Sequence, residues 1–327
     1  MNLKVHYAAD PKPEALIILR SKLAPNIQLS LGKELPTQPN FQVLVNGTPE
    51  RSDLEASPDL VTLIVPYAGL PIDTRVLLLQ YPQIKVYNLH HNAVPTAELA
   101  FALLLAAAKF VVPFDRSLRK HDWSPRYQPN PSLLLDGKSA LILGFGHIGQ
   151  HVGRFCRAFG MEVLAIRRRP DLPLLPGVQA QVFPPNELDQ LLPRTDILII
   201  TLPFTPETGE LIGAGQLSRM KPGGLLVNVG RGRIVDQGTL YQALKDGTLG
   251  AAGLDVWYNY PQDPEQRRDT PPADHPFHEL DNIVMSPHRG GGSLGTESLR
   301  MHHLANLLNA LLKDDDIVKP VDVNAGY

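Results

Sequence analysis

Three glycines at fixed spacing constrain this chain more than any other feature. The stretch "LILGFGHIG" places Gly144, Gly146 and Gly149 directly after a leucine-rich, β-branched run and at the start of an amphipathic segment. In a strand–turn–helix unit the first glycine permits a tight turn, the second lets the backbone approach a pyrophosphate, and the third lets helix and strand pack closely. A glycine-rich turn without a ligand is the alternative. The order strand, turn, helix and second strand favours dinucleotide binding.

Short apolar runs alternate with helical segments almost from end to end, which is typical of open, mostly parallel sheets covered by helices on both faces. A long apolar helix from about Thr96 to Phe110 separates two such systems. We therefore predict an α/β protein with a Rossmann, doubly wound dinucleotide-binding domain over residues 96–292. A second, flavodoxin-like α/β domain, over 1–95 and 293–327, is predicted to be discontinuous.

Composition narrows the class of protein. The chain has 327 residues, which favours two domains, and a net charge of −2, which gives no general case for nucleic acid or an anionic membrane. The single cysteine, Cys156, excludes an intramolecular disulfide. The start of the chain lacks the apolar core of a signal peptide, and the run 99–108 is too short to span a bilayer, so we expect a cytoplasmic protein. The acidic residues 314–316 are expected to form a solvated helix end.

Three consecutive arginines, Arg167, Arg168 and Arg169, end the second strand of the glycine unit in "MEVLAIRRRPDL". An acidic residue normally accepts hydrogen bonds from the adenosine ribose at this position, about 20 residues past the glycines. Arginine cannot accept them, but its donors suit a 2′-phosphate. The cluster therefore predicts NADP as the cofactor, with NADPH preferred over NADH. A solvated basic loop is the alternative.

Two later stretches carry further motifs: residues 201–257, from "TLPFTPETGELIG" through "NVGRGRIVD" to "AAGLDVW", and residues 282–292, "NIVMSPHRGGG". Together with the glycine unit they resemble the D-isomer-specific 2-hydroxyacid dehydrogenase family over about residues 90–292. The resemblance implies NADPH-dependent reduction of a small 2-keto acid, such as glyoxylate or hydroxypyruvate, to a D-2-hydroxy acid. It implies that the flavodoxin-like domain is the substrate domain and that the active site lies in the cleft between the two domains. It also implies a homodimer, with the segment 98–135 contributing to the interface.

Two residues in these stretches are expected to carry the reaction. By the resemblance, Arg231 of "N-x-x-R-G" grips the substrate carboxylate and polarises the keto oxygen, a planar target that suits a permanently protonated fork of donors. His288 corresponds to the acid/base, because hydride transfer to a carbonyl leaves an alkoxide that needs a proton. The alternatives are a surface salt bridge for Arg231 and a structural role for His288.

The resemblance fails at Tyr260. The family usually has a glutamate there, five residues beyond the aspartate of "LDV", which keeps the histidine oriented and protonated. A phenol can orient the imidazole by hydrogen bonding but cannot stabilise imidazolium as a carboxylate does, so we expect a lower pKa for His288 and reduction that favours acidic conditions. Asp263 or Glu265 could replace the missing charge.

Other contacts follow from the resemblance alone. Asp255 is expected to face the nicotinamide carboxamide, while Val229 and Gly230 approach the cofactor through their backbone. The turn in "VPYAGLPID" is expected to offer backbone N–H groups to the substrate carboxylate, with Tyr67, Ala68 and Gly69 as candidates. The remaining cofactor contacts expected are His147, Ile148, Pro203, Thr208 and Gly290.

No spacing of the histidines in the sequence suggests a metal site.

Two other functions stay open. A cofactor-sensing protein would keep the dinucleotide site but lose the chemistry, which Tyr260 favours and the presence of both Arg231 and His288 disfavours. A dehydrogenase of another small anion, such as formate or phosphite, would share the same scaffold.

Overall fold

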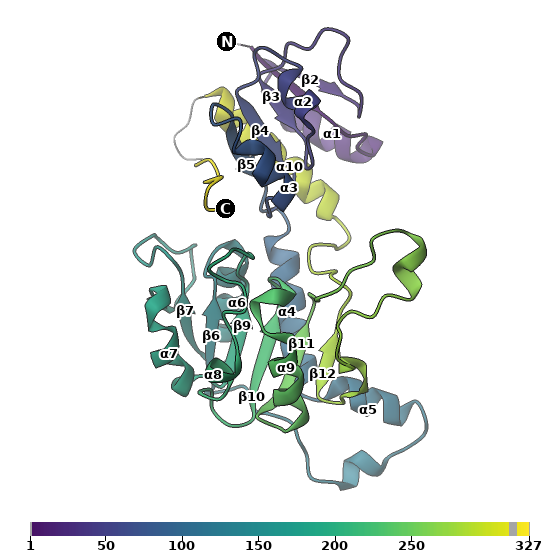
Figure 1. Cartoon of the computed structure of the whole chain (residues 1–327), viewed down its shortest axis with the longest axis vertical. Helices are drawn as coiled ribbons and strands as arrows, with labels where there is room; N and C mark the ends of the chain where they lie inside the picture. The colour runs from purple at the N-terminus through teal and green to yellow at the C-terminus, as the bar shows by residue number, and fades with distance from the viewer. Residues whose placement is uncertain (1, 314–318, 327) are drawn as a thin grey trace. The chain divides into compact units, whose positions relative to one another are not determined.

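A computed structural model describes residues 2–313 and 319–326 of the chain. It divides into two compact units (Figure 1): residues 1–92 with 292–327 form the first, and Ala93–Gly291 the second. The sequence analysis places these limits at residues 96 and 292. The acidic residues 314–316 lie outside the described residues.

The first unit is built on a five-stranded parallel sheet in the order β2-β1-β3-β4-β5. This is the flavodoxin-like order, as predicted. The C-terminal helix packs on the first helix, and its Met301 and Leu304 belong to the same buried apolar cluster as Val5 of the first strand. The elements are β1 (Leu3–Tyr7), α1 (Pro13–Lys22), β2 (Ile27–Leu31), β3 (Val43–Val45), α2 (Arg51–Glu55), β4 (Thr62–Val65), α3 (Ile72–Leu78), β5 (Lys85–Asn88) and α10 (Thr296–Leu312).

The second unit is built on a seven-stranded parallel sheet in the order β12-β11-β10-β9-β6-β7-β8. From β6, the chain winds outward through β7 to β8 and then back through β9 to β12, which is the doubly wound Rossmann arrangement and confirms the predicted fold class. Its strands are β6 (Ser139–Leu143), β7 (Glu162–Ile166), β8 (Gln181–Phe183), β9 (Ile197–Ile200), β10 (Gly224–Asn228), β11 (Leu249–Leu254) and β12 (Ile283–Met285). Its helices are α4 (Ala93–Ala108), α5 (Val111–Leu118), α6 (His147–Ala158), α7 (Leu188–Leu191), α8 (Ala214–Leu217) and α9 (Gln237–Lys245).

Helices α4 and α6 pack against each other, and α4 lies on β10 and β11. The approach is so close that a Cβ on Gly253 would lie 2.8 Å from the Cβ of Leu103. The predicted helix 96–110 thus begins earlier, at Ala93, and ends at Ala108, because Phe110 has a left-handed backbone with φ 51°. Among the described helices, none alone is long and apolar enough to cross a membrane. Helices α4 and α5 reach that length and apolar composition only when they are taken together, and they are bent by 64° where they meet.

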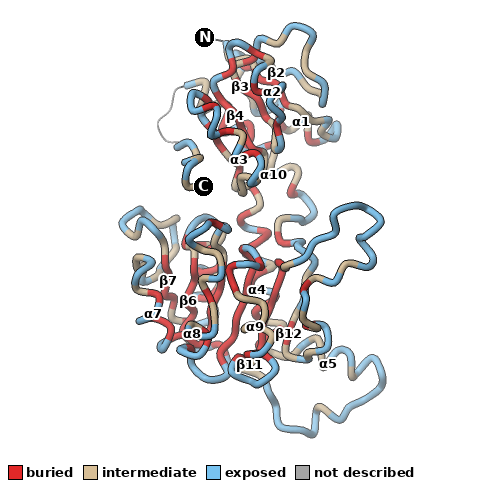
Figure 2. The backbone as a smooth tube through the Cα atoms, in the orientation of Figure 1, coloured by how far each residue is buried: buried red, intermediate tan, exposed pale blue. Residues whose placement is uncertain are grey.

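Apolar side chains fill two separate clusters in the second unit, and Figure 2 shows the strands between them as buried. The loops 120–132 and 259–269 are mostly exposed. Because all seven strands are parallel, their carboxyl ends meet at one edge of the sheet. Gly144, Arg231, Asp255 and His288 all follow strands at this edge.

Candidate active site

The glycine turn joins β6 to α6. Gly144 has a left-handed φ of +92°, and a Cβ on Gly149 would lie 2.3 Å from the carbonyl oxygen of Gly144, so helix and turn are in direct backbone contact. Gly146 precedes the first residue of α6, offers no side-chain cap, and has open space where a Cβ would stand. The first N–H groups of a helix lack intrahelical partners and attract anions. The turn therefore has the room and the donors that a dinucleotide pyrophosphate requires.

The two glycines predict opposite results for the same substitution. Gly149→Ala should destabilise the protein by about 1–3 kcal/mol, because its methyl group would overlap backbone that cannot move aside. Gly146→Ala should change the free energy of unfolding by less than about 0.5 kcal/mol, while weakening NADPH binding about tenfold or more. Urea unfolding and a fluorescence titration with NADPH measure both effects. Equal unfolding curves for the two variants would contradict this assignment.

The three arginines in the loop after β7 differ in their contacts and exposure. The Nη2 of Arg167 donates to the carbonyl oxygen of Pro170 at 2.8 Å and also to that of Leu172. Burial lowers the pKa of the Arg167 guanidinium, which is turned into its own loop. Arg168 and Arg169 are exposed. The sequence analysis predicts that all three arginines bind the cofactor. In the structure, Arg167 instead stabilises the loop that carries the other two.

The turn after β10 holds Arg231 outward. The Asn228 side chain accepts a hydrogen bond from the Gly230 N–H at 3.0 Å and donates one to the Arg231 carbonyl oxygen at 2.9 Å. A Cβ on Gly232 would lie 2.3 Å from the Trp257 carbonyl oxygen, so the turn is wedged against the next loop. The sequence analysis assigns no role to Asn228 or Trp257, although a polar residue that ends a buried strand is a signal for such a role.

The guanidinium of Arg231 is exposed, and its only hydrogen bond in the described chain runs from Nη1 to the Gly230 carbonyl oxygen at 2.7 Å. No carboxylate among the described residues forms a salt bridge with it. A cation held in place without an acidic partner is suited to an anion from solution.

Asp255, at the end of β11, fixes the loop that carries His288. Its carboxylate is 2% exposed and accepts hydrogen bonds from the Ser286 hydroxyl at 2.5 Å and from the N–H groups of Arg289 and Gly290, both at 2.8 Å. These bonds bracket His288, whose φ of +58° is uncommon for a residue with a side chain. Asp255 therefore anchors the histidine loop, a role that the sequence analysis does not assign to it.

The imidazole of His288 has no hydrogen bond to any other described side chain or backbone group. Burial lowers its pKa below the usual 6.5, the nearby charge of Arg231 lowers it further, and Asp255 opposes both. Asp263 and Glu265 are not among the groups that act on this pKa; the Asp263 carboxylate instead accepts from the Glu265 N–H.

Tyr260 contacts His288 through its ring, with centroids 5.6 Å apart and planes inclined by 56°. Its hydroxyl oxygen accepts a hydrogen bond from the Trp257 N–H at 3.0 Å. The Trp257 indole donates to the Ser286 carbonyl oxygen at 2.8 Å. Tyr260 thus lies beside the imidazole, as expected, but the contact is between rings and not the hydrogen bond that the sequence analysis suggests.

The other predicted residues lie in turns. Thr208 donates to the Pro203 carbonyl oxygen at 2.8 Å after β9. In the first unit, the Asn88 side chain donates to the Ala68 carbonyl oxygen at 2.6 Å, and the Tyr67 ring fills the space beside Gly47. Three predicted cofactor contacts differ in exposure: His147 is exposed, Ile148 is half-buried and Val229 is buried. The described residues contain no group of three side chains able to hold a metal ion.

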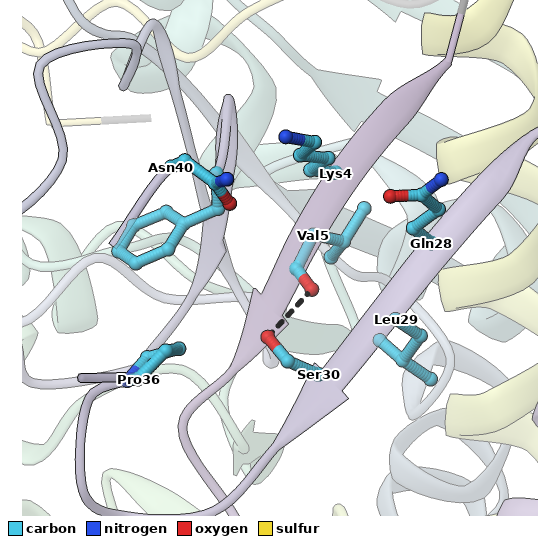
Figure 3. A pocket seen from close by; sticks show the side chains of 8 residues that line it. Lys4, Val5, Gln28, Leu29, Ser30, Pro36 and Asn40 are labelled. Atoms are coloured by element: carbon cyan, nitrogen blue, oxygen red, sulfur yellow. Dashed lines mark hydrogen bonds between the residues drawn. The ribbon is translucent and has the colours of Figure 1, made fainter. Parts of the chain in front are cut away.

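A hollow of about 200 Å³ lies in the first unit, beside β1 and β2 (Figure 3). Its lining includes Lys4, Ser30, Asn40 and Phe41. The Ser30 hydroxyl there donates to the Val5 carbonyl oxygen at 3.2 Å and also lies 3.0 Å from Nδ1 of His6. None of the predicted site residues lines this hollow.

Comparison with known proteins identifies similar sequences. The model of the D-isomer specific 2-hydroxyacid dehydrogenase NAD-binding domain matches residues 101–290. A glyoxylate reductase from Korarchaeum cryptofilum is 39% identical over 67% of this chain and 63% of its own length. A glycerate dehydrogenase from Methylorubrum extorquens is 32% identical over 75% of this chain and 74% of its own length.

The fold also has solved relatives. The NADPH-dependent glyoxylate/hydroxypyruvate reductase from Sinorhizobium meliloti, in complex with NADP and sulfate, superposes with a TM-score of 0.77 at 20% identity and covers 100% of both chains. The family model alone spans more than half of the sequence, and its range includes the glycine turn, Arg231, Tyr260 and His288. The chain therefore belongs to the D-isomer-specific 2-hydroxyacid dehydrogenase family.

Proposed function

We propose that this chain is an NADP(H)-dependent reductase that converts a small 2-keto acid, such as glyoxylate or hydroxypyruvate, into a D-2-hydroxy acid. The observation that carries the proposal is the exposed Arg231 guanidinium, which has no acidic partner among the described residues and is close enough to His288 to lower the pKa of its imidazole. An anion-binding group beside a proton donor, both at the carboxyl edge of one parallel sheet, is what this reduction needs.

Each side chain has a distinct task in the proposed reaction. When bound, the nicotinamide cofactor supplies the hydride. Arg231 binds the substrate carboxylate and stabilises negative charge on the keto oxygen. A ring nitrogen of His288 gives its proton to that oxygen. Asp255 keeps the imidazole in place through the three hydrogen bonds around it.

We assign substrate contacts to the first unit as well. The N–H groups of Ala68 and Gly69 have no backbone partner in the described part of the chain, and they follow β4 at the carboxyl edge of that sheet. Such N–H groups suit a carboxylate. The first unit is thus the substrate domain of the proposal, and the second unit is the cofactor domain.

The cofactor preference depends on the exposed arginines. We expect the double variant Arg168→Ala, Arg169→Ala to weaken NADPH binding ten- to a hundredfold, because a charged hydrogen bond contributes about 1.5–3 kcal/mol. NADH lacks the 2′-phosphate, so its binding should change by less than about threefold. Titration with both cofactors measures the effect.

Arg167→Ala is the matched control for this pair. It removes the support of the loop and not an exposed donor, so it should affect NADPH and NADH alike. Equal losses for both cofactors in the double variant would mean that the loop does not bind a 2′-phosphate.

The second unit also exposes large apolar side chains on and after α5. Trp123 is 61% exposed and Tyr127 82%, with Leu134 at 67%. We propose that a second copy of the chain covers this segment in a homodimer, because exposed aromatic residues are enriched at protein interfaces. Analytical ultracentrifugation tests the proposal, and a monomer at micromolar concentration would contradict it.

The proposed activity is tested by absorbance at 340 nm with NADPH and a panel of glyoxylate, hydroxypyruvate and pyruvate, repeated with NADH. Turnover of at least one keto acid, faster with NADPH, is expected. Formate and phosphite with NADP test the alternative donors. Binding of NADPH without turnover of any substrate would favour a cofactor sensor instead.

A further inference from the structure

The hydroxyl oxygen of Tyr260 accepts a hydrogen bond that fixes its position, but among the described residues the hydroxyl donates none. Its oxygen accepts from the Trp257 N–H at 3.0 Å, and Trp257 itself is only 6% exposed and held by its indole bond to Ser286. The residue Tyr260 is 40% exposed, so a ligand can reach part of it. A hydroxyl whose lone pair is engaged by a backbone N–H remains a donor.

Of the two charged side chains whose fields act on Tyr260, Arg231 is a hydrogen-bond donor. The Arg231 guanidinium has N–H groups beyond the one bonded to Gly230. The nearest acidic group that acts on Tyr260, Asp255, has both oxygens occupied by the histidine loop. Burial raises the pKa of the phenol, which keeps its proton at neutral pH. The site thus presents several donors and no open carboxylate to a small ligand.

We infer that the Tyr260 hydroxyl donates a hydrogen bond to an oxygen on the third carbon of the substrate and so selects 2-keto acids that carry a hydroxyl group there. The inference rests on the proposed function. Arg231 and His288 take the carboxylate and the keto oxygen, so the next group along a three-carbon acid is the substituent at the third carbon. The Tyr260 ring, adjacent to the imidazole, brings a donor beside that substituent.

The inference makes Tyr260 a specificity-determining residue that touches the substrate, in addition to its packing against His288. A polar substituent that finds its partner is favoured over hydrogen at the same place, because an analogue without it leaves the donor unpaired. Hydroxypyruvate and pyruvate form a matched pair of substrates, since they differ only in this hydroxyl group.

The test is Tyr260→Phe, which removes the hydroxyl and keeps the ring. We expect kcat/KM with NADPH to fall about tenfold for hydroxypyruvate and less than twofold for pyruvate. Tyr258→Phe is the control, because it makes the same change two residues away, at a hydroxyl that donates to the Val235 carbonyl oxygen at 3.0 Å. The ratio of the two kcat/KM values should be unchanged in the control.

A second readout does not depend on turnover. D-Glycerate and D-lactate cannot react with enzyme that already holds NADPH, so their binding to that complex can be measured by calorimetry. Tyr260→Phe should weaken D-glycerate about tenfold and leave D-lactate unaffected.

The possible results separate the two proposals. Equal losses for both substrates would show that the hydroxyl acts only through His288 or the loop, and would overturn the inference while leaving the reductase in place. No change for either substrate would overturn it as well. A wild-type protein that reduces neither keto acid and binds neither hydroxy acid would overturn the proposed function together with the inference.

Discussion

Replacement of Arg231 by glutamine is expected to lower kcat/KM for 2-keto acid reduction by about a thousandfold. Glutamine keeps a hydrogen-bond donor but removes the charge and the two-pronged geometry that match a carboxylate beside a keto oxygen. Loss of one preorganised donor to a developing oxyanion costs about 10²–10³ in kcat. Loss of the carboxylate contact should add a rise in KM.

The structure provides a close control for this variant. Arg233 is exposed on the same turn, two residues further along, and Arg233→Gln should leave kcat/KM within about twofold. The free energy of unfolding should be nearly unchanged in Arg231→Gln, because within the described residues this side chain makes a single hydrogen bond, to a neighbouring carbonyl. A loss below tenfold, or an equal loss in Arg233→Gln, would remove Arg231 from the reaction.

His288→Asn is expected to lower kcat by about 10²–10⁴, the usual contribution of a positioned acid. Asparagine is the appropriate replacement because it tolerates the left-handed backbone at this position better than other residues with side chains. Circular dichroism and the unfolding midpoint should therefore stay close to those of the wild type. His278→Asn, at an exposed histidine, is a control that should retain activity.

The pH profile adds a signed test of the same residue. Reduction needs the protonated imidazole, and burial and Arg231 lower its pKa below 6.5. The kcat/KM for reduction should thus be high below that pKa and decline as the pH rises through it, while oxidation of the hydroxy acid shows the opposite trend. The decline should disappear in His288→Asn. A reduction rate that stays constant to pH 8 would contradict this role.

Much of the fold could be predicted from local pattern. The glycine spacing after β6 and the alternation of apolar runs with helices identify the doubly wound sheet. Strands and helices differ in the spacing of their apolar residues, and this spacing can be recognised within a short segment. Even there, α4 begins at Ala93, three residues before the predicted start.

The site was less predictable, because side-chain partners depend on loops that are distant in sequence. Asp255 accepts hydrogen bonds from residues 31 to 35 positions further along the chain, and no periodic sequence pattern predicts such pairs. Arg167 turns inward because the carbonyl groups of Pro170 and Leu172 happen to return toward it. The hydroxyl of Tyr260 bonds to a backbone N–H, a partner that every residue other than proline offers and that sequence therefore cannot single out.

The position of Trp257 has a consequence for how this site can change over time. Its N–H, indole and carbonyl group respectively meet Tyr260, Ser286 and the space beside Gly232, so three loops take their alignment from a single residue. Substitutions in those loops should not have independent effects, because each shifts the common support of the others. Evolution toward a new substrate would proceed through coupled replacements around this tryptophan, and grafting any one loop from a relative would carry a misalignment into the other two.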